Sequence, residues 1–139
     1  MRAIASIFAV LMLVLGGPAL AVEDVEKGAI QEVIRHQLEA FRADDAPSAY
    51  GDAAPSIRRM FPTSEIFIDM VRRGYPPVYR PRAYAFGETK DGSSGPTQSV
   101  RITDAEGTDW LAVYTMERQE DGSWRISGCV LIKDESRSV

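Results

Sequence analysis

The hydrophobic period of the chain changes from helical to alternating near Val78, and this change restricts the possible fold more than any other feature. Between Val25 and Ala43, apolar side chains recur every three or four residues, as they do on the buried face of a helix. From Val78 onward, apolar and polar residues alternate, which is typical of strands. Helices that precede a run of strands predict an α+β domain.

The helices predicted before this change are bounded by recognisable stop signals. Proline disfavours helical geometry in the residue that precedes it, so the first helix is expected to end before Pro47. A serine or threonine often caps the start of a helix, and a glycine often follows its last turn. The expected helical segments are Val25 to Ala43, one or two short turns within residues 48–61, and a helix from Thr63 or Ser64 to Gly74.

Four strands are predicted after the change, and glycine-containing connections join them. Asp121-Gly122 is a hairpin signal, and short hairpins between successive strands make an antiparallel meander. The expected strands are Val78 to Gly87, Thr97 to Thr103, Asp109 to Arg118 and Ser123 to Ile132. We therefore expect an α+β fold in which N-terminal helices pack on a curved four-stranded antiparallel meander that wraps around the first helix.

Alternation along the last two strands assigns their side chains to faces. The expected shared faces are Trp110, Ala112, Tyr114 and Met116 in the third strand, and Trp124, Ile126, Val130 and Ile132 in the fourth. No strand interior offers a carboxylate on the face that Trp110 and Tyr114 share.

The first residues predict export. Arg2 gives a positive start, the run from Ile4 to Leu15 is almost wholly apolar, and Ala19-Leu20-Ala21 presents small residues where a signal peptidase cleaves. The apolar run is short for a transmembrane helix. We therefore expect residues 1–21 to be a signal peptide cleaved after Ala21. Residues 22–139 should then form a single α+β domain in the periplasm or secreted, with no remaining membrane span.

Charge and cysteine content exclude several classes of site. The net charge is −4, and an acidic chain attracts nucleic-acid phosphates poorly, so we expect no nucleic-acid partner. Cys129 is the only cysteine, which excludes an internal disulfide and a cysteine-based metal cage. We expect a buried thiol, with intermolecular pairing as the alternative. Neither a histidine pair nor a carboxylate cluster has metal-ligand spacing, so no metal and no cofactor is predicted.

The stretch MVRRGYPPVYRPRAYAFG, residues 70–87, is dense in arginine, tyrosine and proline. We expect Pro76-Pro77 to hold the chain extended, and Pro81, inside the expected strand Val78 to Gly87, to place that strand at a sheet edge. If the turn is tight, the four arginines converge, and guanidinium groups beside tyrosine hydroxyls suit a carboxylate or phosphate. The alternative is that these arginines pair with surface carboxylates and that the stretch is only a helix-to-strand corner.

Three segments of the chain resemble a known bacterial family. QLEAFRADD, MVRRGYPPVYRPR and DWLAVYTMERQEDGSWRISGCVL are similar to the family called domain of unknown function 4864, over roughly Ile30 to Ile132. More distantly, helices followed by a meander that ends in DGSWRI resemble the nuclear-transport-factor-two-like superfamily, which has a cystatin-like fold. That superfamily includes ketosteroid isomerase, polyketide cyclases and non-catalytic binding modules. The resemblance implies a cone-shaped pocket between sheet and helices.

The residues favour binding over catalysis in such a pocket. Isomerase or cyclase chemistry needs a carboxylate or histidine base that faces an acid such as tyrosine. His36 is the only histidine, and a lone histidine on a helix is more often a structural hydrogen-bonding group than a base. We therefore predict a non-catalytic ligand- or protein-binding module, with a pocket enzyme of the isomerase or cyclase type as the alternative.

Aromatic and basic side chains are the candidates for such binding. Tyrosine and tryptophan combine an apolar body with a polar tip, which suits a pocket or an interface. The expected partner is a small anionic ligand or an envelope protein, and a homodimer is left open. The candidate binding residues are Arg72, Arg73, Tyr75, Tyr79, Arg80, Arg82, Tyr84, Trp110 and Tyr114.

Overall fold

The computed structural model describes residues 19–135. Helices precede strands along the chain, as the change of period predicts. The elements are α1 (Ala19–Arg42), α2 (Ala46–Gly51), α3 (Pro55–Met60), α4 (Ser64–Gly74), α5 (Pro76–Tyr79), β1 (Ala83–Lys90), β2 (Thr97–Thr103), β3 (Asp109–Arg118) and β4 (Trp124–Lys133). The predicted signal peptide falls mainly on residues 1–18, which lie outside the described part. No helix within residues 19–135 is long and apolar enough to cross a membrane.

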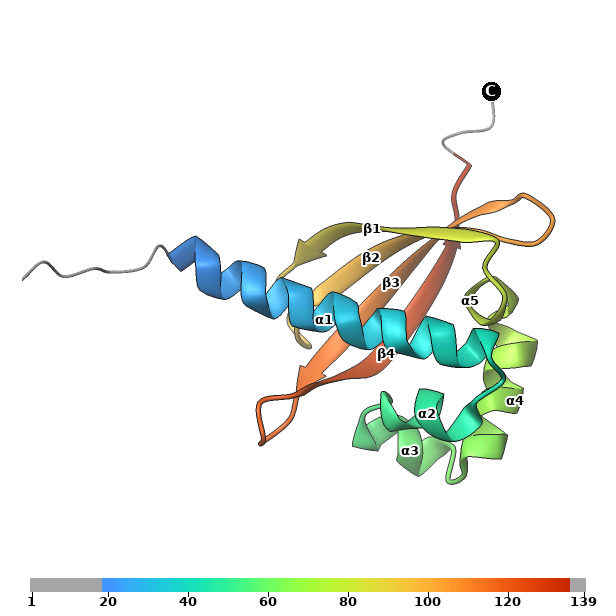
Figure 1. The fold of residues 1–139 in the computed structure, drawn as a ribbon, viewed down its shortest axis with the longest axis horizontal. Coiled ribbons are helices and arrows are strands. Elements are labelled where there is room, and N and C mark those ends of the chain that lie inside the picture. Colours follow the sequence, from blue (N-terminus) through green and yellow to red (C-terminus); the bar gives the residue numbers. More distant parts are fainter. Residues whose placement is uncertain (1–18, 136–139) are drawn as a thin grey trace, which may run out of the picture.

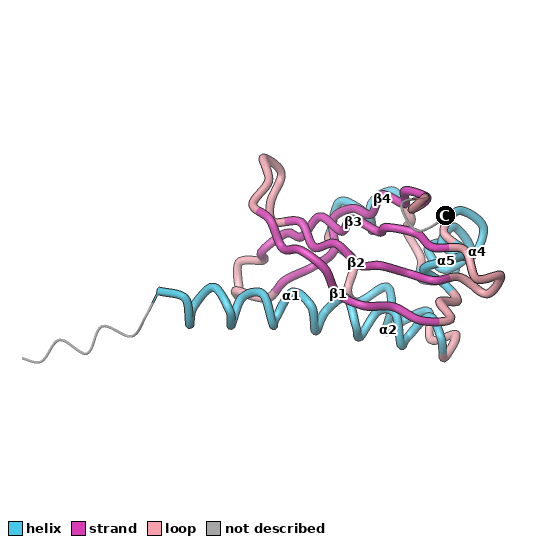
Figure 2. Tube along the Cα trace, turned by 90° about the horizontal axis from the view of Figure 1, so that it is seen from above, coloured by secondary structure: helices cyan, strands magenta, loops and turns pink. Residues whose placement is uncertain are grey.

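The four strands form one antiparallel sheet in the order β1-β2-β3-β4. The predicted α+β fold with a meander is therefore confirmed. Helix α1 runs across one face of the sheet, and α2 to α5 gather at the C-terminal end of α1 (Figure 1). Seen from above, the sheet lies as a separate layer on α1 (Figure 2). This arrangement leaves α3, α4 and the middle of β4 as the walls of a corner beside α1.

The core lies between α1 and the sheet. Apolar residues three or four positions apart on α1 are almost wholly buried, as the helical period predicts. They are Ile30, Ile34, Leu38 and Phe41. Alternate residues of β2 and β3 face them and are equally buried: Val100, Ile102, Ala112, Tyr114 and Met116.

The prediction that Pro76-Pro77 holds the chain extended is wrong, because these residues begin the helical turn α5. Proline is well tolerated in the first turn of a helix, where its missing N–H would have no partner in any case. The amides of Tyr79 and Arg80 donate to the carbonyls of Tyr75 and Pro76, both at 3.0 Å. As a result β1 starts at Ala83 instead of Val78, although it does occupy the predicted sheet edge.

The predicted faces of β4 are wrong in its second half, because Ser127 is an extra residue in the strand. Gly128 pairs with Thr115 and Ile126 pairs with Met116, which leaves Ser127 without a residue opposite it. Such a bulge exchanges the two faces of the strand beyond it. Val130 is accordingly 60% exposed. Ile132 is also exposed, whereas Cys129 and Leu131 pack against the core.

Candidate ligand-binding cavity

A cavity of about 350 Å³ lies between α1, α3, α4 and β4. Phe67, Met70 and Val71 of α4 form one wall, and residues 126–130 of β4 form the opposite one. The β4 wall is thin because Ser127, Gly128 and Cys129 are small and because the bulge directs Val130 towards solvent. Small side chains on β4 therefore keep this corner of the core unfilled.

Helix α3 also lines the cavity, and the segment before it is attached to β4 by backbone hydrogen bonds. The link between α2 and α3 forms a short parallel bridge with the strand, in which Ile126 donates to Asp52 and accepts from Ala54, both at 2.8 Å. The Arg58 guanidinium reinforces the link by donating to the Gly51 carbonyl at 3.0 Å. These contacts hold α3, which carries Ile57 and Met60 at the cavity, in a fixed position against the sheet.

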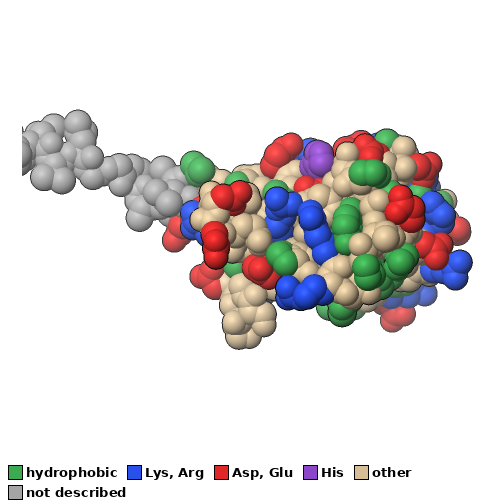
Figure 3. Space-filling model, turned by 90° about the horizontal axis from the view of Figure 1, so that it is seen from below, with side chains coloured by type: hydrophobic (Ala, Val, Ile, Leu, Met, Phe, Trp, Pro, Cys, Tyr) green, Lys and Arg blue, Asp and Glu red, His purple; other side chains and the backbone are tan. Residues whose placement is uncertain are grey.

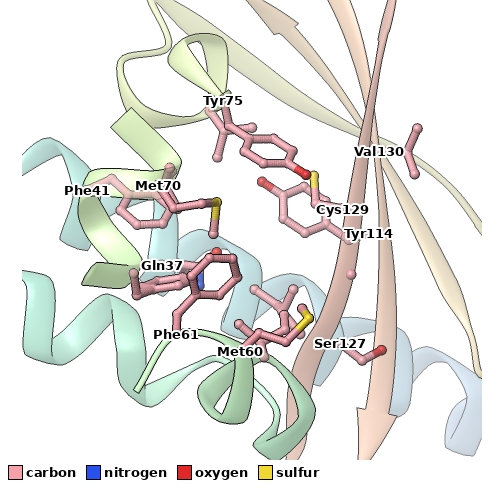
Figure 4. A pocket seen from close by; sticks show the side chains of 16 residues that line it. Gln37, Phe41, Met60, Phe61, Met70, Tyr75, Tyr114, Ser127, Cys129 and Val130 are labelled. Atoms are coloured by element: carbon pink, nitrogen blue, oxygen red, sulfur yellow. The ribbon is translucent and has the colours of Figure 1, made fainter. Parts of the chain in front are cut away.

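None of the described residues that line the cavity is charged. Their polar side chains are few, and two of them are occupied: Gln37 donates to the Ala49 carbonyl at 3.1 Å, and Ser127 donates to the Thr115 carbonyl at 3.1 Å. Figure 4 shows Phe41, Phe61 and Met70 on the helical side of the cavity and Tyr114 and Cys129 on the strand side. The cavity therefore suits an apolar occupant.

Among these polar groups, the Tyr114 hydroxyl is buried without a nitrogen or oxygen partner in the described residues. Tyr114 is only 1% exposed, and the Cys129 thiol is the weakly accepting group beside its hydroxyl. Burial raises the pKa of Tyr114 well above the ordinary value of 10.0. Cys129, which pairs with Tyr114 across the two strands, has its pKa raised by burial to about 12. Both groups are thus protonated at neutral pH, and neither acts as a base there.

Exposed apolar side chains lie near the cavity. On the underside of the molecule, several hydrophobic side chains lie at the end formed by α2 to α4, and charged side chains of both signs lie around them (Figure 3). Met60, which lines the cavity, is 68% exposed. The cavity therefore has an exposed apolar side chain at its edge.

The structure gathers Arg72, Tyr79 and Arg80 around Asp44. Arg80 Nη2 lies 2.7 Å from Asp44 Oδ1, and the Tyr79 hydroxyl donates to the same oxygen. The Arg72 guanidinium stacks on the Tyr79 ring at 5.3 Å from its centre. The hydrogen bond from Tyr79, followed by that from Arg80, lowers the pKa of Asp44. These contacts join α4 and α5 to the end of α1, and anion binding by the group stays a prediction.

The other predicted residues lie in several separate places. Tyr75 and Tyr114 line the cavity. Each of the rest has its own local contact: Arg73 with Asp69 at 3.3 Å, Tyr84 with Glu39 at 3.3 Å, Trp110 with Asp104 at 2.9 Å, and the Arg82 amide with the Thr103 carbonyl at 2.8 Å. The nine candidates therefore do not form one site. Sequence reasoning missed most of the cavity lining, although consecutive small residues within a strand, at 127–129, are a signal of an irregularity there.

His36 lies outside the cavity lining. Its Nδ1 is 2.5 Å from Asp52 Oδ2, and this hydrogen bond is the main cause of the raised pKa of His36. The pair links α1 to the segment that follows α2, which is a structural role. In the part of the chain that the structure describes, no group of three histidine, cysteine, aspartate or glutamate side chains could hold a metal ion.

A family model covers nearly all of this structure. The model named Domain of unknown function (DUF4864) matches residues 23–139, which include every strand and all but the first residues of α1. The chain belongs to this family. No curated protein and no solved structure matches the chain. Membership of the DUF4864 family thus confirms the closer of the two resemblances, and the more distant one, to the nuclear-transport-factor-two-like superfamily, stays a prediction.

Proposed function

We propose that the domain is a non-catalytic binding module that holds a small apolar molecule in the cavity between α3, α4 and β4. The observation that carries this proposal is an uncharged, partly open cavity of about 350 Å³ at the edge of the core. That volume lies within the range of small-molecule sites, about 300–1,000 Å³. Empty apolar space weakens a fold, so a cavity lined by ordered apolar side chains gains stability when a ligand fills it.

The alternative, an isomerase- or cyclase-type enzyme, has less support. Its chemistry needs a base within reach of the substrate. The described lining contains no carboxylate and no histidine, and Tyr114 and Cys129 hold their protons at neutral pH. A cavity that offers a proton donor but no base among its described residues suits recognition of a ligand better than proton transfer.

Filling the cavity should weaken binding. Phenylnaphthylamine, a neutral dye that fluoresces in apolar surroundings, should bind the parent protein. Ile57→Trp places a bulky indole at the cavity wall and should weaken binding at least about tenfold, or about 1.4 kcal/mol. Fluorescence titration measures both affinities.

Ile66→Trp is the matched control for this experiment. Ile66 is 51% exposed on α4 and does not line the cavity, so the same substitution should leave dye affinity unchanged. A parent protein that fails to bind the dye, or equal losses in the two variants, would refute the proposal.

We also propose that the domain acts outside the cytoplasm after cleavage behind Ala21. Two observations support this: the family match begins at residue 23, and within residues 23–42 of α1 the buried residues start at Ile30. Intact-mass measurement on protein from its native compartment should therefore show a chain that starts near Val22. Recovery of the full-length chain from the membrane fraction would contradict export.

A further inference from the structure

The Tyr114 hydroxyl is a buried hydrogen-bond donor with no nitrogen or oxygen acceptor among the described residues. It is the only side-chain nitrogen or oxygen in the described part of the chain that is buried and unpartnered. Leaving such a group unpaired costs free energy, so folded proteins rarely retain one without a reason. Its closest polar neighbour is the thiol of Cys129, and a thiol sulfur is a weak acceptor. The hydroxyl is therefore free to donate to another oxygen.

The hydroxyl faces the cavity. Tyr114 lies on the buried face of β3, and Figure 4 shows its oxygen directed from the strand towards the helical side, between Tyr75 and Met70. The oxygen itself has almost no exposed surface, so a ligand reaches it when a neighbouring side chain moves aside. Met70 is suited to this because it is unbranched, flexible and only partly buried.

The charges around the cavity exclude an anionic ligand. No cationic side chain is among the described residues that line it. Arginines in the helices around the cavity have other partners: Arg58 of α3 contacts the Gly51 carbonyl, Arg72 of α4 the Tyr79 ring, and Arg80, which follows α5, contacts Asp44. A carboxylate moved from water into this cavity would lose its hydration without gaining a counter-charge, which is strongly unfavourable.

We propose that the ligand of this cavity is a neutral molecule with an apolar body and one hydrogen-bond-accepting oxygen, such as a ketone or an ester, and that the Tyr114 hydroxyl donates to that oxygen. This inference rests on the proposed binding function and narrows its ligand class. The apolar body occupies the space between Phe67, Met70 and Ile126, and the oxygen lies at the strand side of the cavity. Tyr114 thereby selects carbonyl compounds over plain hydrocarbons of the same size.

The test compares three compounds of equal chain length: octane, hexyl methyl ketone and octanoate. Each competes with bound phenylnaphthylamine on the parent protein, on Tyr114→Phe and on Tyr84→Phe. The ketone preference, defined as the ratio of ketone affinity to octane affinity, should be about tenfold higher in the parent than in Tyr114→Phe, because one hydrogen bond to a neutral group contributes about 1.4 kcal/mol. The parent should also bind octanoate more weakly than the ketone.

Tyr84→Phe is the matched control, because it removes the same atom from a tyrosine whose hydroxyl contacts Glu39 outside the cavity. It should keep the parent's preference for the ketone. A second measurement needs no comparison of affinities: the infrared carbonyl band of the bound ketone should lie at lower frequency in the parent than in Tyr114→Phe.

The outcomes separate the two proposals. If none of the compounds and no dye binds the parent, the binding function itself is wrong. If the compounds bind but octanoate matches the ketone on the parent, the cavity binds ligands and the assigned ligand class is wrong. An equal ketone preference in the parent and in Tyr114→Phe, or a carbonyl band at the same low frequency in both, would overturn the role of the hydroxyl.

Discussion

At pH 8, iodoacetamide should alkylate Cys129 in the folded domain about a thousandfold more slowly than in the chain unfolded by urea. Only the thiolate reacts, and burial raises the pKa of Cys129 from 9.0 to about 12. That change lowers the thiolate fraction at pH 8 by about a factor of a thousand. Mass spectrometry of samples quenched at successive times gives both rates. Comparable rates in the two states would show that the thiol is not held in the apolar cavity wall.

The same thiol makes the stability of the fold depend on pH. The folded-state pKa is raised, so this contribution to stability is fully present below pH 9 and is lost as pH rises from about 9 towards 12. Tyr114, whose pKa is also raised by burial, acts in the same direction above its ordinary value of 10.0. Urea unfolding at several pH values should therefore show a smaller alkaline loss in Cys129→Ala than in the parent. If the free energy of unfolding falls equally with pH in the parent and in Cys129→Ala, the buried thiol does not contribute to the alkaline loss.

Replacing Gly95 with alanine should destabilise the domain by about 3 kcal/mol. Gly95 lies in the connection between β1 and β2 with φ at +118°, a conformation that side chains other than glycine rarely adopt. A methyl group there would collide with the carbonyl oxygen of Met116. That carbonyl belongs to β3, whose Met116 amide donates to the Pro96 carbonyl at 2.9 Å, so the backbone has little freedom to yield. The free energy of unfolding in urea measures the loss.

Gly28→Ala is the control for this substitution. Gly28 lies inside α1, and a methyl group there would meet nothing within 4 Å. Alanine is a better helix former than glycine, so the free energy of unfolding of this variant should be higher by about 1 kcal/mol. The two substitutions should therefore change the free energy of unfolding in opposite directions. A Gly95→Ala variant as stable as the parent would mean that the connection before β2 differs from the one described.

Much of the fold was predictable because the spacing of apolar residues along a long segment indicates directly which side chains are buried. The bounds of β2 and β3 agree with the sequence prediction, and Thr63 caps α4 as expected, by accepting from the Ile66 amide at 3.2 Å. Alternation over seven or ten residues leaves little freedom in assigning a strand. Two prolines in sequence, by contrast, suit both an extended chain and the first turn of a helix, so α5 could not be distinguished from sequence.

The candidate site was less predictable because it depends on contacts between distant segments. Tyr75 and Tyr114 were candidates because aromatic residues suit a pocket, and both line the cavity, while their role in binding stays a prediction. The pairing of Arg80 with Asp44 joins residues on either side of α4, and no local pattern encodes it. The extra residue in β4 was equally hidden, because a strand with one bulge retains apolar alternation on both sides of it.

The bulge at Ser127 makes the chemistry of the cavity depend on strand length as well as on side-chain identity. Beyond Ser127, the register of β4 decides which set of residues faces inward: Cys129 and Leu131, or Val130 and Ile132. Insertion or loss of a single codon at this point would exchange the two sets together, whereas point substitutions change one residue at a time. Related domains can therefore diverge in what their cavities accept while the helices, the sheet order and the rest of the core stay the same.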